Sequence, residues 1–160
     1  DGTKDVMLFS SGGKAIRIKE SDVRAMGRTA RGVRGIRLKK GERLISLIIP
    51  SENSEILLSS ENGYGKKSKV DDYSIIGRGG QGVICMKGSP RNGKLVGAIE
   101  ISSGDEVILI SDQGTLVRIS SNEVSLQGRN TLGVKLISLA DEEKLVGIAA
   151  VNELEDESET

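Results

Sequence analysis

The sequence RAMGRTARGVRGIRLKKGER at positions 24–43 contains a landmark that recurs along the rest of the chain. The landmark is a Gly-Arg pair followed, five residues after its glycine, by a Gly-Val pair. It occurs as Gly27-Arg28 with Gly32-Val33, as Gly77-Arg78 with Gly82-Val83, and as Gly128-Arg129 with Gly133-Val134. The spacing between successive copies is 50 and 51 residues, which indicates an internal repeat.

A second landmark and the apolar runs keep the same period. Three glycines, Gly13, Gly63 and Gly114, each precede a basic residue by four positions. Apolar runs at 6–10, 56–60 and 107–111 are in step with them, as are runs at 44–49, 95–101 and 145–151. Periods of this length are typical of propellers, solenoids and arrays. We therefore predict three repeats, at about 5–54, 55–105 and 106–151.

Short apolar runs separated by glycine turns favour strands over helices within each repeat. The chain has 21 glycines and two prolines in 160 residues, and its apolar residues are mostly Ile, Leu and Val. Strands are predicted at 5–10, 14–19, 35–38, 44–49, 55–60, 64–69, 83–87, 94–101, 106–111, 115–120, 134–139 and 144–151. Four strands per repeat make a propeller blade. The prediction is an all-β, propeller-like fold with three four-stranded blades over residues 1–151, followed by an acidic tail at 152–160.

Composition argues against several classes of function. The absence of histidine excludes His-based catalytic triads and His metal sites, and the single cysteine, Cys85, is expected to be a small buried residue in a reducing compartment. The acidic clusters at 71–72 and 141–143 lack the spacing of a calcium loop and are expected to be solvated turns. Residues 78–82 lack the Gly-Lys-Ser/Thr of a phosphate-binding loop. We predict no catalytic residue, metal site, cofactor or membrane span in this chain.

The formal net charge of zero conceals a gradient along the chain. Residues 1–51 contain 12 basic and 5 acidic residues, a net charge of +7, and residues 52–103 have a net charge of +1. Residues 104–151 have a net charge of −3, and the tail at 152–160 has one of −5. A basic first repeat and an acidic tail suggest a surface for a polyanion together with an internal acidic competitor.

The basic residues suit a duplex better than a single strand. Arginine forks match phosphate groups, and the neighbouring glycines leave backbone N–H groups accessible. Single-strand binders stack bases on aromatic rings, whereas this chain has only Phe9, Tyr64 and Tyr73. If the blades radiate from one axis, Arg28, Arg78 and Arg129 would line the rim, and a duplex laid on them would have to bend. The alternative is a basic loop that is merely solvated.

Four segments of the sequence resemble the C-terminal domain of the bacterial DNA gyrase A subunit: VRAMGRTARGVRGIRL (23–38), ENGYGKK (61–67), GTLVR (114–118) and GRNTLGVKLI (128–137). The resemblance covers essentially the whole chain. It implies a β-pinwheel, a six-bladed disc whose blades exchange a strand and whose basic rim wraps duplex DNA. Three repeats would be the C-terminal half of that disc. The family's glycine-arginine box is matched at residues 76–82 only at Arg78, Gly79, Gly80 and Gly82.

The resemblance also implies the roles of particular residues and of partners. It places on the DNA-binding rim Arg28, Arg31, Arg34 and Arg37, then Lys66, Lys67 and Arg78, and finally Arg118 and Arg129. The parent enzyme would be an ATP-hydrolysing type II topoisomerase that introduces negative supercoils, with ATP and Mg²⁺ bound outside this chain. Its partners would be duplex DNA, the rest of the gyrase A subunit, and the gyrase B subunit in an A2B2 heterotetramer, in the cytoplasm on the chromosome.

Three questions remain open at the level of sequence. The chain could instead be the C-terminal domain of topoisomerase IV, or a protein-interaction propeller with an incidental basic loop, which the falling positive charge favours. The acidic side chains of 152–160 are expected to compete with DNA for the rim. A half-disc could stay open, or two chains could pair and close a ring.

Overall fold

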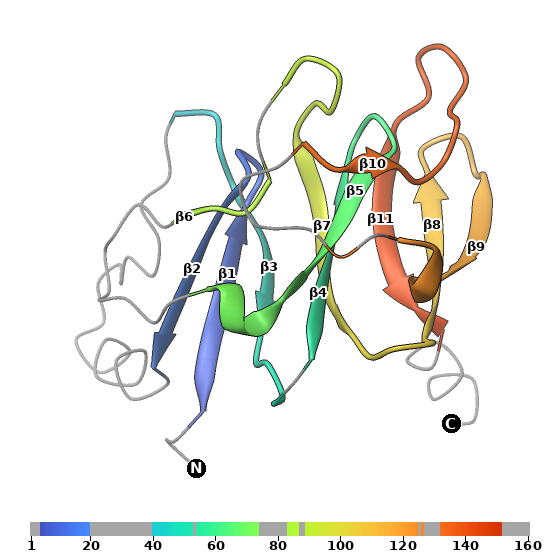
Figure 1. Cartoon of the computed structure of the whole chain (residues 1–160). Helices are drawn as coiled ribbons and strands as arrows, with labels where there is room; N and C mark the ends of the chain where they lie inside the picture. The colour runs from blue at the N-terminus through green and yellow to red at the C-terminus, as the bar shows by residue number, and fades with distance from the viewer. Residues whose placement is uncertain are drawn as a thin grey trace, which may run out of the picture.

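The computed structural model describes residues 4–19, 40–52, 54–73, 83–86, 89–124, 126 and 132–151. These residues form eleven β-strands in three antiparallel sheets and two short 3-10 helices. Figure 1 shows the three sheets side by side, in the order of the chain. We call them the first, second and third blades. The fold is therefore all-β and propeller-like.

Each blade is an antiparallel sheet built mainly from one repeat. The first blade has the strand order β3(Leu44–Ile48), β1(Asp5–Ser10), β2(Lys14–Lys19), β6(Val83–Ile84). The second has the order β10(Val134–Lys135), β5(Tyr64–Lys69), β4(Glu55–Ser60), β7(Leu95–Ile101). The third has the order β11(Leu145–Ala150), β8(Glu106–Ser111), β9(Leu116–Ser120).

Neighbouring blades exchange a strand. Strand β6 comes from the second repeat but pairs with β2 of the first blade, with Ala15 opposite Val83. Strand β10 comes from the third repeat but pairs with β5 of the second blade, with Val134 opposite Gly65. The outer strand of a blade is thus supplied by the following repeat. For this reason the third blade has three strands among the described residues, where the sequence predicted four.

The exchanged strands are shorter than the sequence predicted, because each leaves its sheet after two residues. The amides of Cys85 and Met86 then both donate to the carbonyl of Gly13, over 2.9 and 3.4 Å. At the next blade the amides of Leu136 and Ile137 donate in the same way to the carbonyl of Gly63, over 2.8 and 3.3 Å. The predicted strand at 35–38 lies outside the described residues.

This contact explains the second glycine landmark of the sequence. Gly63 has a φ of +88°, a conformation that disfavours side chains. A Cβ atom on Gly63 would also lie 2.7 Å from the carbonyl oxygen of Ile137, and one on Gly13 would lie 2.7 Å from that of Met86. Glycine at this position of the repeat therefore permits both the tight turn and the close approach of the exchanged strand.

The hydrophobic core lies in layers between the blades. Met7 and Phe9 of the first blade pack with Ile56 and Leu58 of the second, in a cluster that also contains Tyr73 and Cys85. A further cluster joins Leu57 of the second blade to Val107 and Val124 of the third. Alternate residues along a strand point to opposite faces, so a central blade needs apolar residues on both. Burial raises the pKa of the Cys85 thiol to about 12, and the prediction that Cys85 is a buried residue is confirmed.

The acidic cluster at 141–143 is only partly the solvated turn that the sequence predicted, because Asp141 and Glu142 are exposed but Glu143 is buried. Glu143 is only 8% exposed, and its carboxylate accepts hydrogen bonds from the Ser111 hydroxyl (2.6 Å), the Thr115 hydroxyl (2.7 Å) and the Ala140 amide (3.0 Å). These hydrogen bonds lower the pKa of Glu143 below its usual value. The side chain therefore joins the turn before β11 to the hairpin between β8 and β9.

Candidate nucleic-acid interface

Three of the nine predicted DNA-binding residues lie in the described part of the chain. They are Lys66 and Lys67 on β5 and Arg118 on β9. The other six, Arg28, Arg31, Arg34, Arg37, Arg78 and Arg129, lie outside the described residues. Their contact with DNA stays a prediction from the sequence.

Lys66 and Lys67 are both buried, which argues against the predicted contact of these two residues with DNA. Lys66 is 0% exposed and Lys67 is 7% exposed, so a phosphate group in solution would not reach either ammonium group. The physical reason is that β5 lies between β4 and the exchanged strand β10, with another blade on each side. Lys66 lies opposite Leu58, which belongs to the core between the first two blades.

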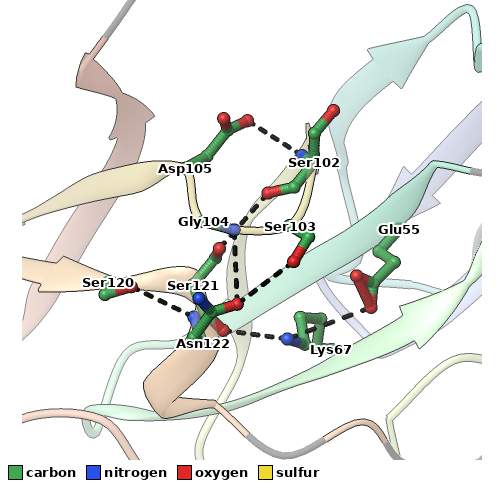
Figure 2. A network of polar contacts seen from close by, with 9 residues as sticks. All are labelled: Glu55, Lys67, Ser102, Ser103, Gly104, Asp105, Ser120, Ser121 and Asn122. Carbon is green, nitrogen blue, oxygen red and sulfur yellow. Dashed lines mark hydrogen bonds and ion pairs between the residues drawn. The ribbon is translucent and has the colours of Figure 1, made fainter.

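Lys67 points the other way, into the contact between the second and third blades. Its Nζ atom donates a hydrogen bond to the carbonyl oxygen of Ser121 over 2.9 Å and lies 3.9 Å from Oε2 of Glu55. Ser121 begins the short 3-10 helix η2(Ser121–Glu123) of the third blade. Figure 2 shows Lys67 between Glu55 and Ser121. The charge of Lys67 thus faces protein groups rather than solvent.

Arg118 is the only one of these three residues that exposes its charged group. Its side chain is 58% exposed, and its guanidinium forms an ion pair with Glu106. An exposed ion pair of this kind contributes little to stability, so the guanidinium is available to a phosphate group. Arg118 remains compatible with the predicted rim.

The structure also shows a set of cations that the sequence reasoning missed. Arg43, Lys94 and Lys144 are exposed, and each immediately precedes the strand β3, β7 or β11. Their spacings of 51 and 50 residues are the signal that would have revealed them. Figure 1 shows the starts of these three strands at the same end of the blades. Acidic residues lie beside two of them, because the Lys94 amide donates to Glu61 and the Lys144 amide to Asp112.

Arg91 is a further cation that sequence reasoning passed over. Its guanidinium carbon lies 4.2 Å from the centre of the Tyr64 ring, and Nη2 donates to the carbonyl oxygens of Leu132 (3.2 Å) and Gly133 (3.1 Å). Arg91 therefore holds the chain just before the exchanged strand β10. The first repeat has Lys40 at this position but the third has Asp141, so the basic residue does not recur in all three repeats.

Comparison with known proteins agrees with this architecture. The family described as the DNA gyrase C-terminal domain, beta-propeller, matches residues 4–51, 54–102 and 105–152. The DNA gyrase A subunit of Pseudomonas aeruginosa is 58% identical over 153 residues, which cover 96% of this chain and 17% of that protein. The chain therefore spans about a sixth of the length of this curated relative.

Two solved structures share the fold. The C-terminal domain of a DNA gyrase A superposes with a TM-score of 0.80 and 29% identity, over 92% of this chain and 50% of that one. The C-terminal domain of a DNA topoisomerase IV superposes with a TM-score of 0.81 over 94% of this chain and 47% of that one. At 19% identity, the second likeness shows the fold alone. Because the family match covers all three repeats, the chain belongs to the family of DNA gyrase C-terminal domains.

Proposed function

We propose that this chain binds duplex DNA without sequence preference and helps to wrap it, as part of the C-terminal domain of a gyrase A subunit. The observation that carries the proposal is the family match over all three repeats, supported by the 58% identity to a relative named as the A subunit of DNA gyrase. The net charge of +7 on residues 1–51 supplies the attraction to phosphate.

The proposed contacts are the arginines of the glycine-rich loops, led by Arg28, Arg31 and Arg34. Arg28 has the same frame in its repeat as Arg78 and Arg129, so blades that follow one another would present these three in a line. A surface of this kind contacts phosphates and not base edges, and it would favour a bent duplex. Arg118, which exposes its guanidinium, is included in the proposed surface.

The chemistry of the whole enzyme is proposed to lie outside this chain. Among the described residues, no group of three or more acidic or cysteine side chains is placed to hold a metal ion. The proposal therefore assigns ATP, Mg²⁺ and the supercoiling reaction to the remainder of the gyrase A protein and to its gyrase B partner, in an A2B2 enzyme on the chromosome in the cytoplasm. No helix in the described ranges is long and apolar enough to cross a membrane.

Topoisomerase IV is the less favoured parent enzyme, because its solved domain is 19% identical to this chain whereas the Pseudomonas aeruginosa gyrase protein is 58% identical. A protein-interaction propeller is the alternative from another class. It predicts weak binding to DNA and no preference for duplex over single strands, which a binding measurement would distinguish.

The test is the binding of a long duplex to this chain across a series of salt concentrations. Replacing Arg28, Arg31 and Arg34 by glutamine should lower the slope of log affinity against log salt by about three, because each lost phosphate contact removes close to one unit. A control variant replaces the exposed residues Lys4, Lys19 and Lys69 by glutamine and so loses the same net charge. An equal fall in both variants would show attraction to net charge only, and no fall in either would refute the proposed contacts.

A further inference from the structure

The basic residue on the second strand of each blade occupies the same position in all three repeats. These residues, Arg17, Lys67 and Arg118, are 50 and 51 positions apart. Each is accompanied by an acid that begins the first strand of its blade: Asp5, Glu55 or Glu106. All three basic residues have that acid as their ion-pair partner.

Arg17 reaches from the first blade to the second. Its Nη1 atom donates to the carbonyl oxygens of Val70 (3.2 Å) and Tyr73 (3.1 Å), at the two ends of the 3-10 helix η1(Val70–Asp72). On the other edge of the Arg17 guanidinium, Nη2 lies 2.8 Å from Oδ2 of Asp5, and Nε donates a hydrogen bond to the same oxygen over 3.0 Å. Asp5 therefore orients the guanidinium toward the following blade.

Lys67 reaches from the second blade to the third in the same manner. Its Nζ atom donates to the carbonyl oxygen of Ser121, the first residue of the 3-10 helix η2. Figure 2 shows that this helix is also hydrogen-bonded to the turn between β7 of the second blade and β8 of the third. The Ser121 hydroxyl donates to the carbonyl of Ser102 (3.3 Å), and the Asn122 side chain accepts from the amide of Gly104 (3.2 Å). Lys67 thus contacts a 3-10 helix of the next blade that is itself held in place by hydrogen bonds.

We propose that Arg17 and Lys67 are positioning residues that set the packing of each blade on the next, and that they are not DNA contacts. A carbonyl oxygen has two lone pairs, so the first carbonyl of each 3-10 helix can accept two hydrogen bonds. One comes from the backbone amide that closes the helical turn, and the other comes from a charged donor of the neighbouring blade. A hydrogen bond from a charged donor in a site shielded from water is stronger than one between neutral groups. It also has a strict geometry, which apolar packing alone lacks.

This assignment deepens the proposed function and rests on it in one respect. If DNA follows successive blades, the packing of one blade on the next determines how sharply the DNA must curve. Arg17 and Lys67 would then act on the DNA path through the blades, without touching a phosphate. The third blade supplies an internal control, because Arg118 occupies the same position but its pair with Glu106 is exposed.

The first experiment measures amide hydrogen exchange in the full chain without DNA. The variant Lys67→Met keeps an unbranched side chain but removes the donor. The amides of Ser121 and Val124, which donate to Asp105 and Ser121, should exchange on the order of ten- to a hundredfold faster. Lys67→Arg should restore the protection. Arg118→Met should leave these rates within about twofold of the wild type, as surface substitutions do.

Two outcomes would overturn the inference. One is unchanged exchange at Ser121 and Val124 in Lys67→Met, and the other is equal acceleration in Arg118→Met. Lys67→Met also leaves the Glu55 carboxylate without the cation of Lys67. The double variant Glu55→Gln with Lys67→Met removes this uncompensated negative charge as well. The double variant should show the same local acceleration, and wild-type exchange in it would also overturn the assignment.

The second experiment connects the contact to DNA. Relaxed circular DNA is incubated with the chain and treated with a topoisomerase, and the trapped change in linking number is counted. Lys67→Met should trap a smaller change than the wild type, while its affinity for a short straight duplex stays the same. An unchanged linking number would overturn the role in the DNA path. If the wild type traps none, the proposed function fails, but the exchange result still decides whether the contact between blades exists.

Discussion

The contact between Gly63 and the exchanged strand can be tested by replacing this glycine with alanine. Gly63 lies in the hairpin between β4 and β5 with a φ of +88°. Its carbonyl accepts the amide of Leu136 over 2.8 Å, and an added Cβ would meet the Ile137 carbonyl oxygen at 2.7 Å. Gly114 is the matched control, because it has a φ of +83° at the same position of the third repeat and nothing lies within 4 Å of an added Cβ.

The expected magnitude follows from these two geometries. The left-handed conformation costs an alanine about 1–2 kcal/mol at either site. At Gly63 the added methyl group must also displace a backbone carbonyl, and forced overpacking of this kind costs roughly 1–3 kcal/mol more. Gly63→Ala should therefore lower the free energy of unfolding by about 2–5 kcal/mol, and Gly114→Ala by about 1–2 kcal/mol.

Urea unfolding followed by circular dichroism gives both free energies, and hydrogen exchange of the Leu136 amide reports the exchanged strand directly. The Leu136 amide should lose protection in Gly63→Ala and keep it in Gly114→Ala. Equal destabilisation by the two substitutions, with Leu136 equally protected, would refute the argument that close approach of the exchanged strand requires glycine here.

Three further predictions follow from single residues and from the tail. Because the pKa of Glu143 is lowered in the folded state, its carboxylate stabilises the fold above the ordinary glutamate pKa of about 4.5, and this stabilisation is lost as the pH falls through the folded pKa. Glu143→Gln should therefore be less stable than the wild type near neutral pH and should lose less stability on acidification to pH 3. Thermal melts at the two pH values measure both differences. Since burial raises the pKa of Cys85 to about 12, a thiol reagent at pH 8 should label it only as fast as the fold opens, and rapid labelling in native buffer would contradict the burial. Removing residues 152–160, which lie outside the described residues, should tighten duplex binding at low salt in a filter-binding assay, whereas no change would leave the tail without a competing role.

The sequence by itself determined the architecture at the level of repeats. The 50-residue period, the glycine landmarks and the alternating apolar runs predicted an all-β, propeller-like chain. They succeeded because turn geometry and strand alternation are local properties, encoded within a few residues of each site. Gly13 and Gly63 were correctly identified as repeated turn positions for this reason.

Only the tertiary structure decided which groups the blades bury and which they expose. Lys66 and Lys67 look like rim cations in the sequence, but Lys67 meets Ser121, 54 residues away, across a contact that exists only when two blades pack. Likewise, the residues around Val83 in the sequence do not indicate that Val83 pairs with Ala15 of the preceding repeat. Strand exchange and burial of charge depend on partners distant in the chain, because the low local dielectric and the hydrogen-bond acceptors that stabilise them are assembled by folding.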